Sequence, residues 1–348
     1  MKNPLLIIFI LFLGFQGSLF SQGSASMREA KKDSVVAYTY PYVMPILGQK
    51  VADKGFQIPL PMGVMINTFF GNQNLTLSNM SVGFNDGPMY NLDSIIQFGD
   101  VTAQAFTLNT RIDTWIFPFW DLYVMGGYGN ANTSVGIVKP VDFTTDTKSN
   151  GYYFGLGSTI AFGIRGFFGS LDGSYIWNYQ NLLTKPAKLL TVGLRTGPVI
   201  RFKKHKDMNI VPWVGVLFTN LSNETVGSIS SSEVFPGGGS QIDELQGKLD
   251  GWYDGLTPVK QKLYEDLYNN ISDGLTNISE NAGNSTIQYS MQKSIDRPYN
   301  MIIGGQWQIN QRYQIRAEAQ FLGDRTGGLL SFNYRFGIKG KNFLAGQN

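Results

Sequence analysis

Charged and amide side chains recur at every second position in several segments of this sequence. Asn109, Arg111 and Asp113 alternate with apolar residues, and Arg316 and Glu318 repeat the pattern near the C-terminus. Side chains two residues apart point to the same face of a β-strand. A face that carries arginines, carboxylates and amides could select small polar or charged solutes, as rings of charge do in pores.

The candidate lumen-lining residues follow from placing the apolar face of each strand outward. They carry both signs of charge and have two alternative uses. They could line a solute path, or they could pair with one another across a narrow interior, so that no buried charge stays uncompensated. A one-residue error in register would exchange the two faces. The set is Asn109, Arg111, Asp113, Asp172, Arg195, Gln306, Arg316, Glu318 and Arg335.

The elements that must position these residues are strand-length segments of alternating apolar and polar residues. Almost every segment has an apolar face, and too little of the chain is left to cover these faces, so lipid is the natural cover. The pattern predicts an all-β fold, a transmembrane antiparallel up-and-down β-barrel of about ten strands. We expect strands at 59–74, 101–117, 119–138, 151–165, 167–180, 188–203, 208–220, 298–310, 312–323 and 328–337.

The predicted connections alternate between tight and long, as they do in barrels with short periplasmic turns and longer outer loops. Aromatic residues near the strand ends predict girdles at the two membrane interfaces, with Trp115, Trp120 and Trp307 on the periplasmic side and Tyr128, Trp177 and Tyr179 on the outer side. The expected extracellular loops are 75–100, 139–150, 181–187, 221–297 and 324–327.

The last long loop, 221–297, contains two apolar stripes at helical spacing. The first runs from Ile242 to Leu256, and the second follows Thr257 and Pro258, which suit an N-cap and the first helical position. The loop is therefore expected to hold a helical excursion within 241–271. Its helices could plug the lumen, cap the outer mouth or bind a partner.

Composition agrees with a barrel and indicates export. Charged residues make up only 15% of the 348 residues, below the roughly 25% usual for soluble domains. A positively charged start, an apolar run too short to span a bilayer and small residues after it predict a signal peptide at 1–21. Residues 22–55 are expected to form a periplasmic N-terminal segment, and 56–348 the outer-membrane β-barrel. The absence of cysteine excludes disulfides and a lipid anchor on cysteine.

Catalytic, metal and nucleic-acid chemistry have little support in the sequence. The only histidine, His205, falls in a predicted periplasmic turn with no serine or carboxylate partner nearby, so we expect no enzyme and no catalytic residues. We expect no cofactor and no metal site, because cysteine is absent and histidine is not paired. A formal net charge of +3, spread along the chain, gives no reason to expect nucleic acid as a partner.

Segments 60–64, 75–76, 112–123 and 126–129 resemble an uncharacterised group of exported outer-membrane β-barrel proteins of Gram-negative bacteria. The resemblance covers most of the predicted barrel. It implies a fold and a location in the cell outer membrane, but no substrate and no catalytic residues.

The sequence thus predicts a porin-like transmembrane barrel, a narrow channel or transport component for small polar or charged solutes. The alternative is a non-transporting surface barrel that anchors extracellular loops for adhesion or partner binding. The expected partners are membrane lipid, the barrel-assembly machinery during biogenesis and a small polar solute.

Overall fold

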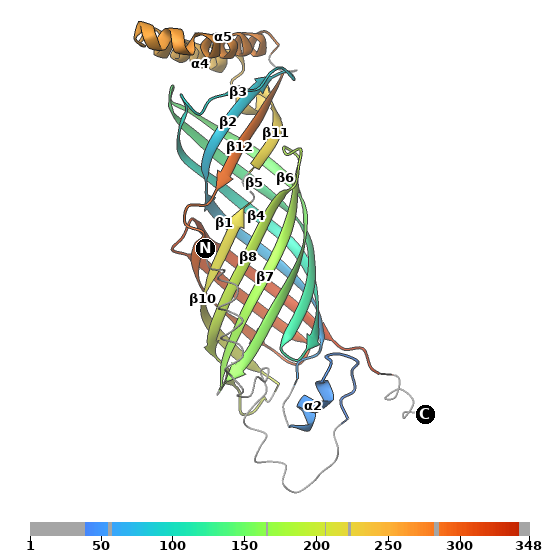
Figure 1. Cartoon of the computed structure of the whole chain (residues 1–348). Helices are drawn as coiled ribbons and strands as arrows, with labels where there is room; N and C mark the ends of the chain where they lie inside the picture. Colours follow the sequence, from blue (N-terminus) through green and yellow to red (C-terminus); the bar gives the residue numbers. More distant parts are fainter. Residues whose placement is uncertain are drawn as a thin grey trace, which may run out of the picture.

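The computed structural model describes residues 39–54, 58–164, 166–205, 207–221, 224–281 and 285–340. Its main body is one long closed sheet, with helices at one end and a short helix at the other (Figure 1). The predicted signal peptide, 1–21, and the first part of the predicted periplasmic segment lie outside the described residues.

Ten strands of the described chain form the barrel, which confirms the predicted fold class. Neighbours in the ring follow chain order and pair antiparallel, and the ring closes because β1 pairs with β15 and β10 with β13. A two-residue strand, β9 (Ile200–Arg201), pairs with β10 beside the end of β8. The ten are β1 (Met62–Asn74), β4 (Gln97–Phe117), β5 (Trp120–Lys139), β6 (Phe143–Ile164), β7 (Phe167–Gln180), β8 (Ala187–Pro198), β10 (Asn209–Leu221), β13 (Tyr299–Gln308), β14 (Tyr313–Phe321) and β15 (Arg325–Phe336).

The outward face of the barrel is apolar. On β4 the outward side chains include Phe106, Leu108 and Ile112, and Leu108 is 49% exposed. The same alternation runs through β5, β6, β8 and β15, and the large exposed side chains there include Val124, Phe154, Leu156, Leu194, Leu330 and Phe332. Such an exposed band would be unstable in water and matches the lipid-facing surface of an outer-membrane barrel.

Four strands outside the barrel form a second, smaller sheet, which we call the outer sheet, at the end opposite the short helix (Figure 1). Its order is β11 (Glu224–Ser230), β12 (Thr286–Ser294), β2 (Thr76–Phe84) and β3 (Tyr90–Asn91). The predictions of loops over 75–100 and 221–297 are therefore wrong in part, because β2 and β12 continue beyond the barrel strands β1 and β13 and pair with each other.

The predicted loop over 139–150 is also wrong. β5 and β6 continue as a paired hairpin, with Ile137 opposite Phe143, and are joined by a short turn at 140–142. The inward residues nearest the tip of this hairpin, Val135, Ile137 and Phe143, are apolar and are covered by the outer part of the molecule, so pairing is favoured over an open loop.

Helices cover the outer sheet. The predicted excursion is present as α3 (Ser231–Val234), α4 (Gly239–Asp254) and α5 (Pro258–Glu280), which lie above the outer sheet and outside the barrel (Figure 1). Pro258 is at the start of α5 and Thr257 is its N-cap, as predicted, although the threonine side chain makes no capping hydrogen bond. None of the described helices has the length and hydropathy needed to cross a bilayer.

A small apolar core joins the helices to the sheet. Ile242 and Leu249 from α4 and Leu275 and Ile278 from α5 are buried, and Ile278 is fully inaccessible. They pack against four buried residues of the outer sheet and the α3 region, Val82, Ile229, Phe235 and Ile287. The apolar stripes that predicted the helices are thus buried on the outer sheet, and the helices cap it without filling the lumen.

At the opposite end the described part of the predicted periplasmic segment contacts the barrel rim. The Val43 N–H donates to the Ile338 carbonyl at 2.9 Å, and the Ile46 N–H donates to the Ile116 carbonyl at 2.8 Å. The short helix α2 (Gly48–Asp53) follows, with Val51 and Ala52 buried.

The packing of α5 on β2 leads to a testable expectation. A Cβ at Gly274 would lie 2.2 Å from the Phe84 ring, whereas a Cβ at the exposed Gly247 of α4 would meet nothing within 4 Å. Gly274→Leu should therefore force α5 off the sheet at a cost of about 1 to 3 kcal/mol, and Gly247→Leu should favour its helix.

Limited trypsin digestion of the protein in liposomes should show faster cleavage at Lys260 and Lys262 in Gly274→Leu only. Heat-modifiable gel migration should stay normal in both variants. Equal protection of α5 in the two variants would mean that this contact does not hold the helices in place.

Candidate functional site

The barrel encloses a cavity of about 400 Å³, and all nine sequence-predicted lumen residues lie around it. They come from β4, β7, β8, β13, β14 and β15, so residues distant in sequence meet across the interior. The residues so placed are Asn109, Arg111, Asp113, Asp172, Arg195, Gln306, Arg316, Glu318 and Arg335.

Arg111 is the centre of a charged cluster inside the barrel. Its Nη2 is 2.6 Å from Asp121 Oδ2, its Nη1 is 3.8 Å from Asp172 Oδ2, and its Nε is 3.9 Å from Asp113 Oδ1. The guanidinium also lies 3.5 Å from the ring centroid of Tyr123, in a cation–π contact. One arginine thus faces three carboxylates and an aromatic ring.

Tyr123 connects this cluster to β7. Its hydroxyl donates to Asp172 Oδ2 at 3.1 Å, and Thr159 Oγ1 donates to the same oxygen at 2.8 Å. The tyrosine ring lies over Gly157, where a Cβ would come within 2.1 Å of the ring. A glycine at this position of β6 is therefore what allows Tyr123 to lie flat against the wall and reach Asp172.

Asp113 and Arg335 form a second contact of the cluster across β1. Register places Asp113 and Arg335 on either side of Gly63, and Arg335 Nη2 lies 3.1 Å from Asp113 Oδ2. Both side chains are almost inaccessible. Gly63 leaves room for them, since a Cβ there would lie 2.7 Å from Asp113 Oδ1.

A separate ion pair crosses the lumen between β8 and β14. Arg195 Nε and Nη2 donate to the two oxygens of Glu318 at 2.7 and 3.1 Å, which is the bidentate geometry of strong pairs. Trp213 Nε1 donates to Glu318 as well, at 3.1 Å. Glu318 is therefore held by three hydrogen bonds, and Arg195 is compensated.

Two lumen arginines have no carboxylate within ion-pair distance in the described chain. Arg316 donates from Nε to the Gln306 side-chain oxygen at 2.9 Å. Arg325 lies over the Phe69 ring, 4.3 Å from its centroid. The described residues that line the cavity include five arginines and four carboxylates, so the interior carries a small excess of positive charge.

The sequence-based set missed four important members of this site, Asp121, Tyr123, Trp213 and Arg325. The alternation itself could have found the first two, because Asp121 and Tyr123 alternate with the outward Leu122 and Val124 on β5. The prediction that Trp115 belongs to an interface girdle is wrong. Trp115 is on the inward face of β4 and lines the cavity, because it lies an even number of positions from Arg111 and Asp113, which also point inward.

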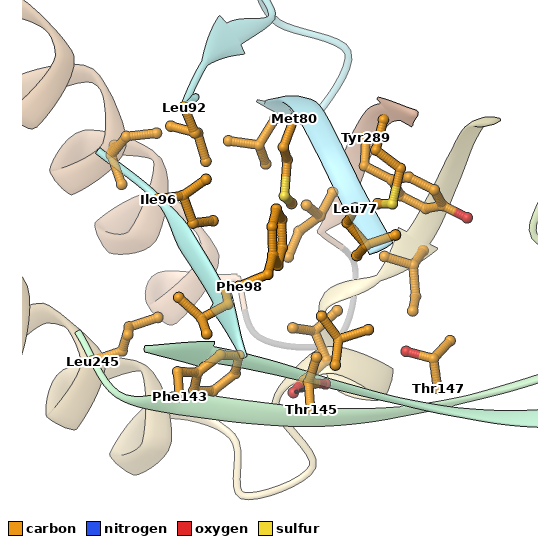
Figure 2. Close-up of a pocket in the computed structure, with 18 of the residues that line it drawn as sticks. Leu77, Met80, Leu92, Ile96, Phe98, Phe143, Thr145, Thr147, Leu245 and Tyr289 are labelled. Carbon is orange, nitrogen blue, oxygen red and sulfur yellow. Dashed lines mark hydrogen bonds between the residues drawn. The ribbon is translucent and has the colours of Figure 1, made fainter. Parts of the chain in front are cut away.

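A second cavity, of about 290 Å³, lies between the outer sheet, the extended β4, β5 and β6, and the helices; we call it the outer chamber. Figure 2 shows lining side chains from several elements pointing toward one another, with Leu77 and Met80 from β2, Phe98 from β4 and Leu245 from α4. The wall is almost entirely apolar, and the polar groups include Thr147 and Ser149 on β6 and Gln180 on β7.

The outer chamber and the lumen cavity occupy successive stretches of the same strands. On β4, Val101 lines the chamber and Ala105 lines the lumen, whereas on β6 Ser149 lines the chamber and Tyr153 the lumen. The inward positions between the two linings on β4, β5 and β6 hold small residues, namely Ala103, Gly127, Gly129, Ala131 and Gly151. The side chains of these three strands leave space between the two cavities.

No group of His, Cys, Asp or Glu side chains in the described ranges is arranged to hold a metal ion. His205 lies exposed in the turn between β9 and β10.

The close fit at Gly63 makes a testable prediction about the charged cluster. Gly63→Val should separate Asp113 from Arg335 and leave both buried without each other, which we expect to lower the free energy of unfolding by about 2 to 4 kcal/mol. Urea unfolding in liposomes, followed by tryptophan fluorescence, would measure this loss.

Gly173→Val on β7 is the matched control, because a Cβ there meets nothing within 4 Å. If both variants unfold at the same urea concentration, the Asp113–Arg335 pair does not contribute to barrel stability.

Comparison with known proteins finds solved structures of low similarity. No protein-family model and no curated protein matches the sequence. Among solved structures, the β domain of the Bordetella autotransporter Brka is 11% identical, with 80% of this chain and 100% of that chain covered and a TM-score of 0.37. The transport unit of the Escherichia coli autotransporter AIDA-I is 13% identical, with coverages of 82% and 96% and a TM-score of 0.34.

The COG4313 outer membrane channel from Pseudomonas putida F1 is 8% identical, with coverages of 80% and 95% and a TM-score of 0.29. These similarities are too low to assign a family or an activity. The closed ring of ten strands and its apolar outer band show that the chain is an outer-membrane β-barrel.

Proposed function

We propose that this barrel is a narrow channel or transport component for small polar or charged solutes, with a preference for anions. The observation that carries the proposal is the lumen cavity, which stays open beside the ion pairs and has two arginines without a carboxylate partner in the described chain. A volume of about 400 Å³ is within the range of small-molecule sites.

The arrangement of charge supports solute selection over a packed polar core. Arg195 and Glu318 compensate each other, and in the Arg111 cluster two arginines face three carboxylates, so these contacts hold the wall in place. Arg316 and Arg325 keep their positive charge available to an ion in the lumen. A solute anion passing them would replace water with a favourable electrostatic contact.

No catalytic role is proposed. His205 lies in an exposed turn at the end of the barrel that carries α2, away from the lumen charges. The inward carboxylates Asp113, Asp121, Asp172 and Glu318 all contact arginines, which suits structural pairing more than proton transfer.

Single-channel recording in planar bilayers tests the channel proposal. A unit charge about 8 Å from a passing ion contributes roughly 0.5 to 2 kcal/mol at an effective dielectric constant between 80 and 20. The double variant Arg316→Gln/Arg325→Gln should therefore conduct, with an anion-to-cation permeability ratio several-fold lower than that of the unmodified protein.

Arg312→Gln is the matched control, since Arg312 is exposed at the end of β14 and contacts Tyr334 outside the lumen. It should leave the permeability ratio unchanged. A correctly folded barrel that passes no current, or an unchanged ratio in the double variant, would reject the channel proposal. Arg111→Ala and Arg195→Ala are poorer tests, because each would leave buried carboxylates without their partner.

The second candidate function is a non-transporting surface barrel that presents its outer sheet and helices to a partner. One observation favours it, namely that α5 exposes Val259 and Leu263 at 81% and 71%. Neither side chain is in the core that joins α5 to the outer sheet.

Deletion of residues 237–282 separates the two candidates. For a surface barrel, we expect loss of binding to host or partner cells and no current before or after deletion. For a channel, we expect current to persist in the deleted protein.

A further inference from the structure

The outer chamber contains one charged residue among the described residues that line it, Lys293. It is on β12, on the same face as Ile287, Tyr289 and Met291, and opposite Leu77 of β2. Its neighbours along and across the sheet are therefore apolar or aromatic. An ammonium group in such a wall needs a partner or water to offset its lost hydration.

No partner is provided by the described chain. The Lys293 side chain forms no ion pair or hydrogen bond with any described residue, and it is half-buried. Burial lowers the pKa of the Lys293 amine. By contrast, two other polar groups of the chamber wall have partners: the Tyr289 hydroxyl donates to the Leu182 carbonyl at 3.1 Å, and the Thr145 hydroxyl donates to the Val234 carbonyl at 3.3 Å.

The position of Lys293 gives the chamber two unlike ends. Lys293 is one residue from the barrel-proximal end of β12, and Thr147 and Ser149 line the chamber on the barrel-proximal side of Phe143 on β6. The opposite end lies under the helices and is lined by Leu245, Leu249, Trp252 and Leu275. A cation and hydroxyls are thus at the end next to the lumen, and hydrocarbon and aromatic side chains are at the other.

We propose that the outer chamber is a binding site for an amphipathic organic acid, with its hydrocarbon body under α4 and α5 and its anionic head at Lys293. The apolar wall favours a hydrocarbon body because burial removes apolar surface from water. The single uncompensated cation favours one negative charge over a neutral or positive head. A cavity of about 290 Å³ is near the lower end of ligand sites, which suits a medium-length chain.

This site goes beyond the proposed channel, because binding in the chamber requires no conduction through the barrel. The two proposals can fail separately. The channel proposal is measured as current through the lumen, and the binding proposal is measured as ligand bound in the outer chamber.

Equilibrium dialysis with radiolabelled decanoate tests the proposal. The full protein is embedded in lipid nanodiscs, so that detergent does not compete, and empty nanodiscs give the background. We expect saturable binding of one decanoate per barrel. Decanol should compete weakly, and decyltrimethylammonium should compete least, because neither has an anionic head.

Three variants locate the ligand. Lys293→Gln should weaken decanoate binding by about tenfold or more through loss of a charge-assisted contact, whereas Lys293→Arg should largely retain it. Ile96→Trp should reduce the number of bound ligands, since Ile96 projects into the chamber and a larger side chain would fill it (Figure 2).

Lys262→Gln on the exposed face of α5 is the matched control and should bind like the unmodified protein. Normal heat-modifiable migration would establish that each variant is folded. The proposal is overturned if decanoate shows no saturable binding above empty nanodiscs. It is equally overturned if folded Lys293→Gln binds as tightly as the unmodified protein.

Discussion

The structure depends on the requirement that every backbone hydrogen-bonding group in the bilayer be paired within the protein. An open sheet would leave the edges of β1 and β15 exposed to lipid, at a cost of several kcal/mol for each unpaired group. Their pairing, from Met62 opposite Phe336 to Gln73 opposite Arg325, removes both edges. Once the ring is closed, every second side chain must point inward, and the lumen chemistry follows from strand register.

A ring of ten strands leaves an interior in which charges on non-adjacent strands can meet. Arg195 reaches Glu318 from β8 to β14, and Arg111 reaches Asp172 from β4 to β7. These pairs compensate charges that would otherwise be costly at low dielectric constant. Glycine is present where a larger side chain would clash with the groups of this network. A Cβ at Gly63 would clash with Asp113, and a Cβ at Gly157 would clash with the Tyr123 ring. Ion pairs therefore join the strands around the lumen, and a cavity remains between them.

Beyond the membrane the same strands meet a different requirement. β4, β5 and β6 carry inward apolar residues such as Val101, Val135 and Phe143 past the lumen, and there the ring no longer encloses them. The four-stranded outer sheet and the two long helices supply the missing cover, with Ile242, Ile278 and Ile287 at the centre of the contact. The packing under this cover is not complete, because a chamber remains between the sheet, the helices and the barrel strands. Lys293 is the charged group in the described lining of that chamber.

The sequence by itself determined a barrel of about ten strands with alternating apolar and polar faces, because alternation with a period of two is a local property. It also predicted the two helices, from stripes such as Ile242 to Leu249 and the Thr257-Pro258 start. Only the tertiary structure decided that the long connections contain a second sheet and that the helices cap it. Strand pairs such as β2 with β12 join residues about 210 positions apart, and their energy comes from partners that no local pattern identifies. For the same reason, the pairing of Arg111 with Asp121 and the lack of a carboxylate at Arg316 appear only when the ring is closed.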